Sequence, residues 1–320
     1  MNKNLLKVKK FEPEIEDILS EVIDGFERPQ KQLPSKLFYD KRGSQLFDQI
    51  TELEEYYPTR TEIAIMEQNI DSICSVLGEN CLLIELGSGS SIKIRLLIEN
   101  LLNPAGYVPI DISEEHLTDS AEILSRDYPE LRIMPVYADY TQPFSLPNFD
   151  FPYSRKVVYY PGSTIGNFPP VSAKRFIDSV AEWAGKGSGL LIGVDLVKDV
   201  KTLEDAYNDR KGVTAEFNLN ILRRLNREIG SDFNIGMWRH DAFYNEKESR
   251  IEMHLVSLAD QEVRVNGTRY RFRKDESILT EYSYKYSLEG FKKLVSGSFR
   301  VDEVWTDKEN KFSIQYLTAF

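Results

Sequence analysis

Two spacings of apolar residues alternate along the middle of the chain. Short apolar runs, typical of buried strands, cover residues 81–86, 106–110, 131–137, 155–160 and 188–194. Stretches with apolar residues at helical spacing lie between them, at 92–102, 114–127 and 171–184. Strands that alternate with helices in this way predict an α/β fold, in which a mostly parallel sheet carries helices on both faces.

After Asp195 this alternation stops. A helical stretch at 214–229 is followed by two strand-like runs, 250–258 and 262–272, and the dipeptide Asn266-Gly267 is a strong turn signal. We therefore predict a hairpin in this region, inserted into the α/β pattern.

The two ends of the chain carry further predicted elements. Residues 13–26 and 63–77 have apolar positions at helical spacing, and Thr59-Arg60-Thr61-Glu62 resembles a capping box at the start of the second of these helices. The chain finishes with a predicted helix at 287–295 and strands at 300–305 and 311–320.

The break in the pattern divides the chain into two predicted lobes. Its 320 residues exceed the roughly 100 to 200 usual for one domain. We expect a core formed by residues 61–195 and 287–320, and a smaller α+β lobe, which binds the substrate, formed by residues 1–60 and 196–286.

Composition narrows the classes of partner. The net charge of -11 and the pI near 5.0 argue against a surface for nucleic acid or anionic membrane, because both are bound mainly through clustered Lys and Arg. Two cysteines, the lack of a long apolar run and a polar start predict a reduced, cytoplasmic protein. The three histidines are scattered, so no metal site is expected. We expect a monomer with a small-molecule ligand.

The first strand leads into a glycine-rich turn, Glu85-Leu-Gly87-Ser-Gly89. A dinucleotide-binding turn would have a third glycine where Ile92 stands, and the phosphate loop G-x-x-x-x-G-K-[ST] is missing. The pattern therefore favours a nucleotide without phosphate groups over NAD or ATP.

Acidic residues at the ends of the next two strands support this interpretation. Asp111 can accept both hydroxyls of a ribose, and Asp139 with Tyr140 can bind the amine and the ring face of adenine. S-adenosylmethionine, with its sulfonium and no phosphate, suits an acidic site, and Glu85 would lie near its cationic end. Alternatively, the glycines form only a tight turn, Asp111 caps the next helix and Asp139 is a loop carboxylate.

A Gly/Pro-rich loop, residues 161–170, follows the fourth strand and lies at the same predicted edge of the sheet. It contains Asn167, whose amide can both donate and accept hydrogen bonds. Asn167 either borders a methyl acceptor or bonds its own backbone, as asparagines in such turns commonly do.

Six segments, in this order along nearly the whole chain, resemble the histidine-specific N-methyltransferase family. They are LFYDKRGSQLFDQITELEEYYPTRTE, IELGSGSSIKIRLLIENL, YVPIDIS, YYPGSTIGNF, AYNDRKGVTAEFNLNIL and TEYSYKYS. The resemblance implies a class I, Rossmann-like methyltransferase that trimethylates the α-amine of L-histidine to hercynine, the first step to ergothioneine. The alternative is another aromatic amino acid as acceptor, such as the prenylated tryptophan methylated by fungal enzymes that the family resembles.

The resemblance also implies roles for individual residues. Those that hold S-adenosylmethionine are Gly87, Lys93, Asp111, Asp139 and Tyr140. Those that bind the amino acid are Tyr56, Asn167, Tyr207, Met253, Glu281 and Ser283, with Glu281 and Ser283 on the imidazole. Tyr39 and Asn167 are the candidates to guide the amine during catalysis.

The chemistry of histidine agrees with these roles. Imidazole both donates and accepts through its two nitrogens, so a carboxylate and a hydroxyl can read both, whereas an indole offers a single donor. Outside the resemblance, Glu281 would be interpreted as a solvated carboxylate on a strand. We expect the acceptor in a cleft between the lobes. A nicotinamide oxidoreductase and a non-enzymatic sensor of S-adenosylmethionine remain as rivals.

Overall fold

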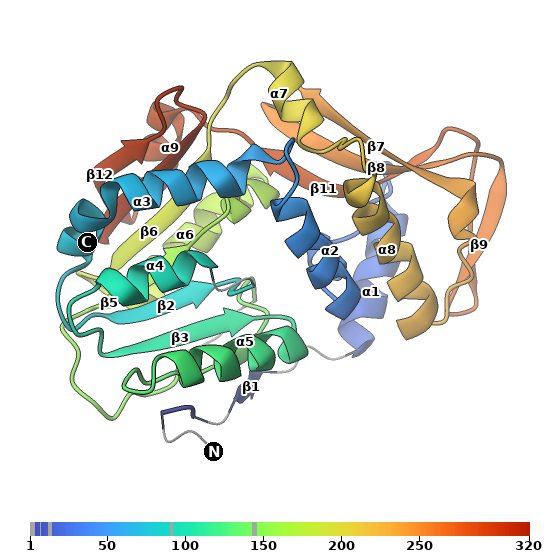
Figure 1. Ribbon diagram of the computed structural model, residues 1–320. Helices are drawn as coiled ribbons and strands as arrows, with labels where there is room; N and C mark the ends of the chain where they lie inside the picture. The colour runs from blue at the N-terminus through green and yellow to red at the C-terminus, as the bar shows by residue number, and fades with distance from the viewer. Residues whose placement is uncertain (1–3, 7, 12–14, 90–91, 143–145) are drawn as a thin grey trace. The chain divides into compact units, whose positions relative to one another are not determined.

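The computed structural model describes residues 4–6, 8–11, 15–89, 92–142 and 146–320 (Figure 1). The chain forms two compact units. Unit 1 comprises Met1–Glu12, Pro58–Val197 and Lys285–Phe320, and unit 2 comprises Pro13–Tyr57 and Lys198–Tyr284.

Unit 1 is built on an eight-stranded sheet with the order β1-β4-β3-β2-β5-β6-β13-β12. The first six strands in this order are parallel to their neighbours, and β13 is antiparallel to both β6 and β12. The strands are β1 (Lys9–Phe11), β2 (Leu82–Leu86), β3 (Gly106–Asp111), β4 (Val136–Ala138), β5 (Lys156–Tyr160), β6 (Gly189–Asp195), β12 (Phe299–Thr306) and β13 (Phe312–Ala319).

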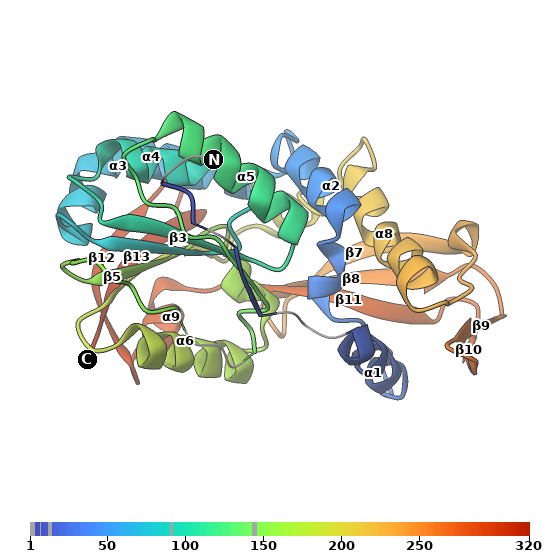
Figure 2. The same ribbon diagram turned by 90° about the horizontal axis from the view of Figure 1, so that it is seen from below.

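Helices cover both faces of this sheet, as predicted (Figure 2). On one face lie α3 (Tyr57–Leu77), α4 (Ile92–Asn100) and α5 (Glu114–Asp127), and on the other α6 (Pro170–Ala184) and α9 (Leu288–Val295). All described residues of β2, β3 and β6 are buried, because a strand covered on both faces exposes neither set of side chains.

The order in which the chain adds strands to the sheet reverses between β2 and β5. From β2 the chain proceeds through β3 to β4 on one side, and it then returns to β5 and β6 on the other side. In such sheets ligands bind beyond the carboxyl ends of the strands at the point of reversal. The turn after β2 and the loop after β5 both lie at this point.

Unit 2 combines a three-stranded antiparallel sheet, ordered β11-β8-β7, with a separate two-stranded hairpin and four helices among its described residues. Its core is rich in aromatic side chains, and α8 packs on both α2 and the sheet (Figure 1). The elements are α1 (Ile15–Phe26), α2 (Lys41–Thr51), α7 (Val200–Asp205), α8 (Val213–Glu228), β7 (Trp238–Asn245), β8 (Arg250–Ser257), β9 (Gln261–Val265), β10 (Thr268–Phe272) and β11 (Ser277–Tyr284), with short 3-10 helices at η1 (Ser35–Phe38) and η3 (Ile235–Met237).

The predicted hairpin is wrong in its pairing. Asn266 and Gly267 do form a tight turn, with φ of 45° and 85°, but it joins β9 to β10. The run at 250–258 pairs instead with β7 and β11. Polar residues occupy about half of β7, so its sequence lacks the apolar signal of a buried strand.

Two further predictions at the N-terminal side are wrong. The first residues belong to unit 1 rather than to the second lobe, because β1 extends the large sheet beside β4. The proposed capping box lies inside α3, which already begins at Tyr57. Glu62 is therefore not a capping residue, and its side chain is fully buried.

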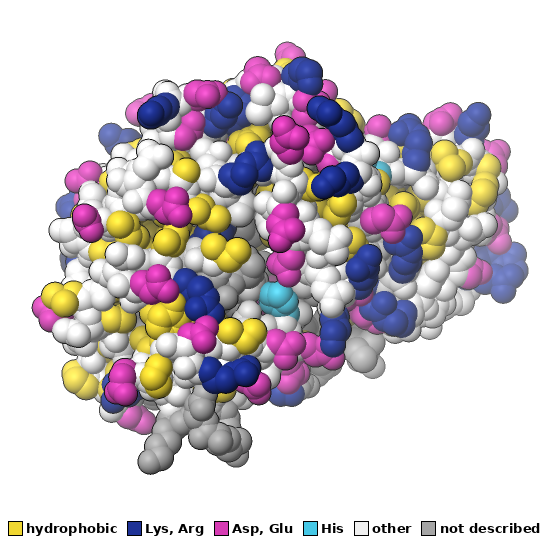
Figure 3. Space-filling view, in the orientation of Figure 1, with side chains coloured by type: hydrophobic (Ala, Val, Ile, Leu, Met, Phe, Trp, Pro, Cys, Tyr) yellow, Lys and Arg dark blue, Asp and Glu magenta, His cyan; other side chains and the backbone are white. Residues whose placement is uncertain are grey.

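The surface of the molecule carries side chains of both charges. Acidic and basic side chains are interspersed on the face shown in Figure 3. In the described part of the chain, none of the helices has the length and apolar character needed to span a bilayer.

Candidate functional site

The glycine-rich turn after β2 presents its backbone at the switch point. Gly87 has a φ of +74°, which favours glycine, and its N–H donates to the Ile110 carbonyl at 2.8 Å. A Cβ on Gly87 would lie 3.4 Å from the Tyr140 hydroxyl, whereas one on Gly89 would meet open space. Ser90 and Ser91 lie outside the described residues. The turn thus leaves room for a ligand beside Gly89.

Asp111 ends β3 and Asp139 directly follows β4, the next two strands of the sheet on one side of β2, so their carboxylates lie at the same edge of the sheet. Asp111 Oδ1 accepts from the Ser113 N–H at 2.8 Å, and Asp139 Oδ1 accepts from the Thr141 N–H at 3.0 Å. Asp111 thus bonds the backbone of Ser113, the residue before α5, so the alternative in which it caps that helix has a structural basis.

Tyr140 lies beside these carboxylates with an aromatic surround. Its ring centroid is 6.0 Å from that of Tyr160 and 6.0 Å from that of Phe176. Burial raises the pKa of the Tyr140 hydroxyl, so the group stays a neutral donor.

Buried polar atoms at this edge fit a polar ligand without phosphate groups. Ser88 is 3% exposed, and its Oγ has no hydrogen-bond partner among the described residues. In this part of the chain His116 Nε2, in the first turn of α5, is also buried without a partner. Burial raises the pKa of Glu85 to about 8, although the Tyr107 hydroxyl and Lys93 lower it. A phosphate would be repelled by the carboxylates of Asp111 and Asp139 at this edge, whereas a sulfonium would be attracted.

Lys93 lies in the first turn of α4, directly after the glycine-rich turn. Its ammonium forms an ion pair with Glu62 at 2.7 Å, and the two side chains are 12% and 0% exposed. Lys93 thus places a cation at this edge that suits a carboxylate of the ligand.

Asn167 ends a short 3-10 helix, η2 (Thr164–Asn167), in the loop after β5. The backbone of this loop is bent through Gly162 and Ser163, with φ of 74° and 57°. Ser163 Oγ accepts from the Asp195 N–H at 2.9 Å, and the Thr164 hydroxyl donates to the Pro161 carbonyl at 2.9 Å. Thr164, rather than Asn167, thus supports the turn.

The predicted residues of the amino-acid pocket in unit 2 come together. The Tyr207 hydroxyl donates to Ser283 Oγ at 2.7 Å, and the ring of Tyr56 lies 6.3 Å from that of Tyr207. Glu281 is the partner of Met253 across the β11–β8 pair, after an irregularity in register at Leu279. Side chains alternate between the faces of a strand, so Glu281 and Ser283 share one face.

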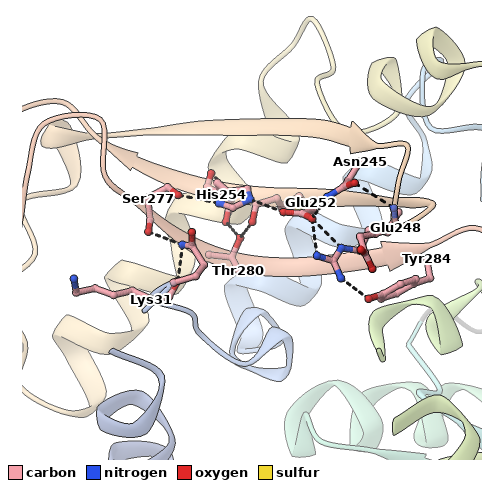
Figure 4. Close-up of polar contacts among 12 residues, drawn as sticks. Lys31, Asn245, Glu248, Glu252, His254, Ser277, Thr280 and Tyr284 are labelled. Atoms are coloured by element: carbon pink, nitrogen blue, oxygen red, sulfur yellow. Dashed lines mark hydrogen bonds and ion pairs between the residues drawn. The ribbon is translucent and has the colours of Figure 1, made fainter. Parts of the chain in front are cut away.

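The neighbouring tyrosines, Tyr282 and Tyr284, lie on the opposite face of β11. The Arg250 guanidinium stacks 3.8 Å from the centroid of the Tyr282 ring and donates to the Tyr284 hydroxyl. Glu252 accepts from Arg250 and from Asn245, and it contacts His254 at 3.2 Å (Figure 4). This face is a closed polar network. The two tyrosines therefore take up no space on the face of β11 that carries Glu281 and Ser283.

Two aromatic residues of unit 2 escaped the sequence interpretation. The ring of Phe47 lies 5.9 Å from Tyr39 and 6.2 Å from Tyr56, and the ring of Phe217 lies 5.9 Å from Tyr39. The rings of Tyr39, Phe47, Tyr56 and Tyr207 thus form a continuous series. Aromatic faces attract cations, so this series suits a charged amine.

A buried polar group behind Tyr207 was also not singled out. The His240 imidazole contacts the Tyr207 carbonyl and the Asn218 amide, each at 2.8 Å. Burial lowers the pKa of this imidazole, so the ring is neutral. Asn218 Oδ1 in turn accepts from the Thr280 hydroxyl at 2.8 Å. These contacts hold the backbone of Tyr207 and the side chain of Thr280, the residue before Glu281.

The fold and the site together define a class of enzyme. The sheet order from β4 to β12, the antiparallel β13 and the acidic residues beside a glycine-rich turn are those of a class I S-adenosylmethionine-dependent methyltransferase. Residues 18–319 match the family described as histidine-specific, SAM-dependent methyltransferases. The chain belongs to this family, as the sequence motifs predicted.

Two relatives carry names that agree with this family. The chain is 37% identical over 306 residues to the histidine N-alpha-methyltransferase of Mycolicibacterium smegmatis, covering 93% of this chain and 94% of that protein. It is 34% identical over 319 residues to ergothioneine biosynthesis protein 1 of Neurospora crassa, covering 95% of this chain and 35% of that protein.

A solved structure, an S-adenosylmethionine-dependent methyltransferase from Clostridium acetobutylicum, matches with a TM-score of 0.47 and 11% identity. The match covers 87% of this chain and 98% of that one. The strand order of unit 1, and not this likeness, identifies the class of methyltransferase. Within the described residues, no three His, Cys, Asp or Glu side chains cluster in a way that could hold a metal ion.

Proposed function

We propose that this protein transfers three methyl groups, one at a time, from S-adenosylmethionine to the α-amine of L-histidine. The product is hercynine, and the reaction is the first step of ergothioneine biosynthesis. The observation that carries the proposal is that Glu281 and Ser283 share one face of β11, where the Tyr207 hydroxyl donates to the Ser283 hydroxyl. Family membership and the named relatives support it.

The polar atoms at the carboxyl edge of the sheet fit the cofactor. Asp111 would bind the ribose hydroxyls, Asp139 and Tyr140 the adenine, and Lys93 the carboxylate. The turn at Gly87 would allow close approach of the backbone. When bound, S-adenosylmethionine supplies an electrophilic methyl group on a positively charged sulfur.

Tyr207 decides how Ser283 recognises imidazole. Ser283 Oγ accepts from the Tyr207 hydroxyl, and its own O–H is proposed to donate to an imidazole nitrogen of the bound substrate. Glu281 then accepts from the N–H on the other side of the ring. A pair with one donor and one acceptor selects the neutral imidazole over indole, which has no ring acceptor.

The remaining residues act on the amine. It must be neutral to attack, so each of the three transfers follows the loss of a proton. Asn167, Tyr39 and Tyr56 are proposed to orient the amine through hydrogen bonds and aromatic contact, and their contribution is positioning and exclusion of water. The aromatic series from Tyr39 to Tyr207 also accommodates the cation that grows with each methyl group.

Product analysis tests this function. With histidine and S-adenosylmethionine, mass spectrometry should show products with one, two and three added methyl groups. Glu281→Gln should lower kcat/KM for histidine by about 10- to 100-fold, since a poorly satisfied buried polar pair costs about 1–3 kcal/mol.

Glu246→Gln, in the exposed turn between β7 and β8, is the matched control and should leave kcat/KM unchanged. A competition between histidine and tryptophan should favour histidine. Wild-type protein that methylates tryptophan but not histidine would overturn the proposed substrate.

A further inference from the structure

Glu62 is a fully buried carboxylate that no sequence motif assigned to the site. It lies in the second turn of α3 with 0% of its side chain exposed. Oε2 contacts the Lys93 ammonium at 2.7 Å, and the two carboxylate oxygens accept from the Gly162 N–H at 3.1 and 3.0 Å. One side chain thus joins α4, which follows the cofactor turn, to the loop that carries Asn167.

The surrounding backbone is shaped for this carboxylate. A Cβ on Gly193, in β6, would lie 2.2 Å from Glu62 Oε1, so a glycine is needed where α3 approaches the sheet. Gly162 adopts a φ of +74°, which turns its N–H toward Glu62, and a Cβ there would lie 3.6 Å from Lys93 Nζ. Gly193 therefore makes room for the Glu62 carboxylate, and Gly162 donates its N–H to it.

The charge balance argues against a purely structural pair. Burying two charges costs desolvation free energy, and apolar residues of similar size are often at least as stabilising as a buried ion pair. Glu62 and Lys93 lie beside a second buried acid, Glu85, whose carboxyl is also influenced by both. A buried cation that is retained at the edge where the cofactor is expected suits a ligand with a carboxylate.

We propose that Glu62 is a positioning residue shared by the two ligands. It holds the Lys93 ammonium in place for the carboxylate of S-adenosylmethionine, and it anchors the Gly162 amide at the base of the turn that presents Asn167 to the amino acid. This inference rests on the proposed function. Glu62 itself touches neither ligand in this arrangement.

Two double variants separate the two roles, because both replace the buried ion pair by a neutral pair. Lys93→Met with Glu62→Gln keeps an amide oxygen that can accept from the Gly162 N–H. Lys93→Met with Glu62→Leu removes this acceptor. Calorimetric titration with S-adenosylhomocysteine and with histidine, each added to the protein alone, measures the two affinities, and scanning calorimetry measures Tm.

Both double variants should bind S-adenosylhomocysteine about tenfold more weakly than wild type, because the cation is lost. Histidine should bind the Gln double variant with nearly wild-type affinity and the Leu double variant about tenfold more weakly. If both double variants bind histidine alike, Glu62 does not position the Asn167 loop. A merely structural Glu62 predicts this equal binding, whatever the difference in Tm between the two double variants.

The single variant Glu62→Gln tests the other role. It keeps Lys93 but removes the charge that holds it, so binding of S-adenosylhomocysteine should weaken about tenfold. Wild-type affinity for S-adenosylhomocysteine in this variant would overturn the assignment of Lys93 positioning to Glu62.

A measurement on the unmodified protein covers the case in which a variant does not fold. In wild type with 15N-labelled glycine, added histidine should shift the Gly162 amide resonance, and an unchanged resonance would overturn the loop role. Failure of the proposed function is distinguishable, because wild type would then not bind histidine while the S-adenosylhomocysteine titrations would still test Glu62.

Discussion

Glu85, at the end of β2, has a carboxyl group that is 2% exposed. Burial raises its pKa from 4.5 to about 8, so between these pH values the folded protein holds a proton that the unfolded chain releases. The stability contributed by the protonated group is therefore fully present below pH 4.5 and is lost as pH rises through about 8. Above that pH an ionised carboxylate is buried, which suits a cationic ligand.

Glu85→Gln should separate stability from cofactor charge. The amide has the same shape and does not ionise, so at about pH 9 the free energy of unfolding should exceed that of wild type by roughly 5 kcal/mol. At that pH the variant should bind cationic S-adenosylmethionine more weakly but bind S-adenosylhomocysteine, whose sulfur is neutral, unchanged. Denaturant titration and calorimetry measure both. An equal loss for the two ligands would contradict a charge effect.

Tyr39 is predicted to control how many methyl groups are added. Its ring belongs to the aromatic series of unit 2, and its hydroxyl is a hydrogen-bond partner for an amine. Tyr39→Phe keeps the ring and removes the hydroxyl, so the ratio of mono-, di- and trimethylated histidine should change. Tyr270→Phe, in the β9–β10 hairpin, is the control and should leave the ratio as in wild type. An unchanged ratio in Tyr39→Phe would argue against the role.

Elements with a strong local signal were predicted closely. The apolar run at 188–194 is β6, and the helical stretch at 114–127 is α5. In both, packing on the sheet buries the residues that the spacing selected. The signal is weak in β7 and in α2, where polar residues dominate and partners distant in sequence decide the conformation.

The approach of α3 to β6 is predicted to depend on one glycine. Gly193→Ala would place a methyl group against Glu62 and 3.1 Å from the Phe312 ring, so it should lower the free energy of unfolding by roughly 1–3 kcal/mol. Because Glu62 must move, S-adenosylhomocysteine should also bind more weakly. Ile192→Val, the preceding residue of the strand, should cost about 1 kcal/mol without changing this affinity. Chemical denaturation and calorimetry compare the two variants.

Across the whole molecule, the chain passes between its two units four times, at 12/13, 57/58, 197/198 and 284/285. The candidate residues divide accordingly. Unit 1 carries Gly87, Lys93, Asp111, Asp139, Tyr140 and Asn167. Unit 2 carries Tyr39, Tyr56, Tyr207, Met253, Glu281 and Ser283. The residues proposed for the cofactor thus belong to the α/β sheet, and most of those proposed for histidine belong to the inserted segments.

The sequence by itself determined the α/β class, the glycine-rich turn and the order of the acidic strand ends, because these depend on local spacing and on short motifs. Only the tertiary structure decided that Glu62 joins α4 to the loop after β5. It also decided that Phe47 and Phe217 extend the aromatic series, and that Tyr282 and Glu281 lie on opposite faces of β11. These contacts join residues far apart in the chain or depend on strand pairing, and a single sequence carries no local signal for such pairs.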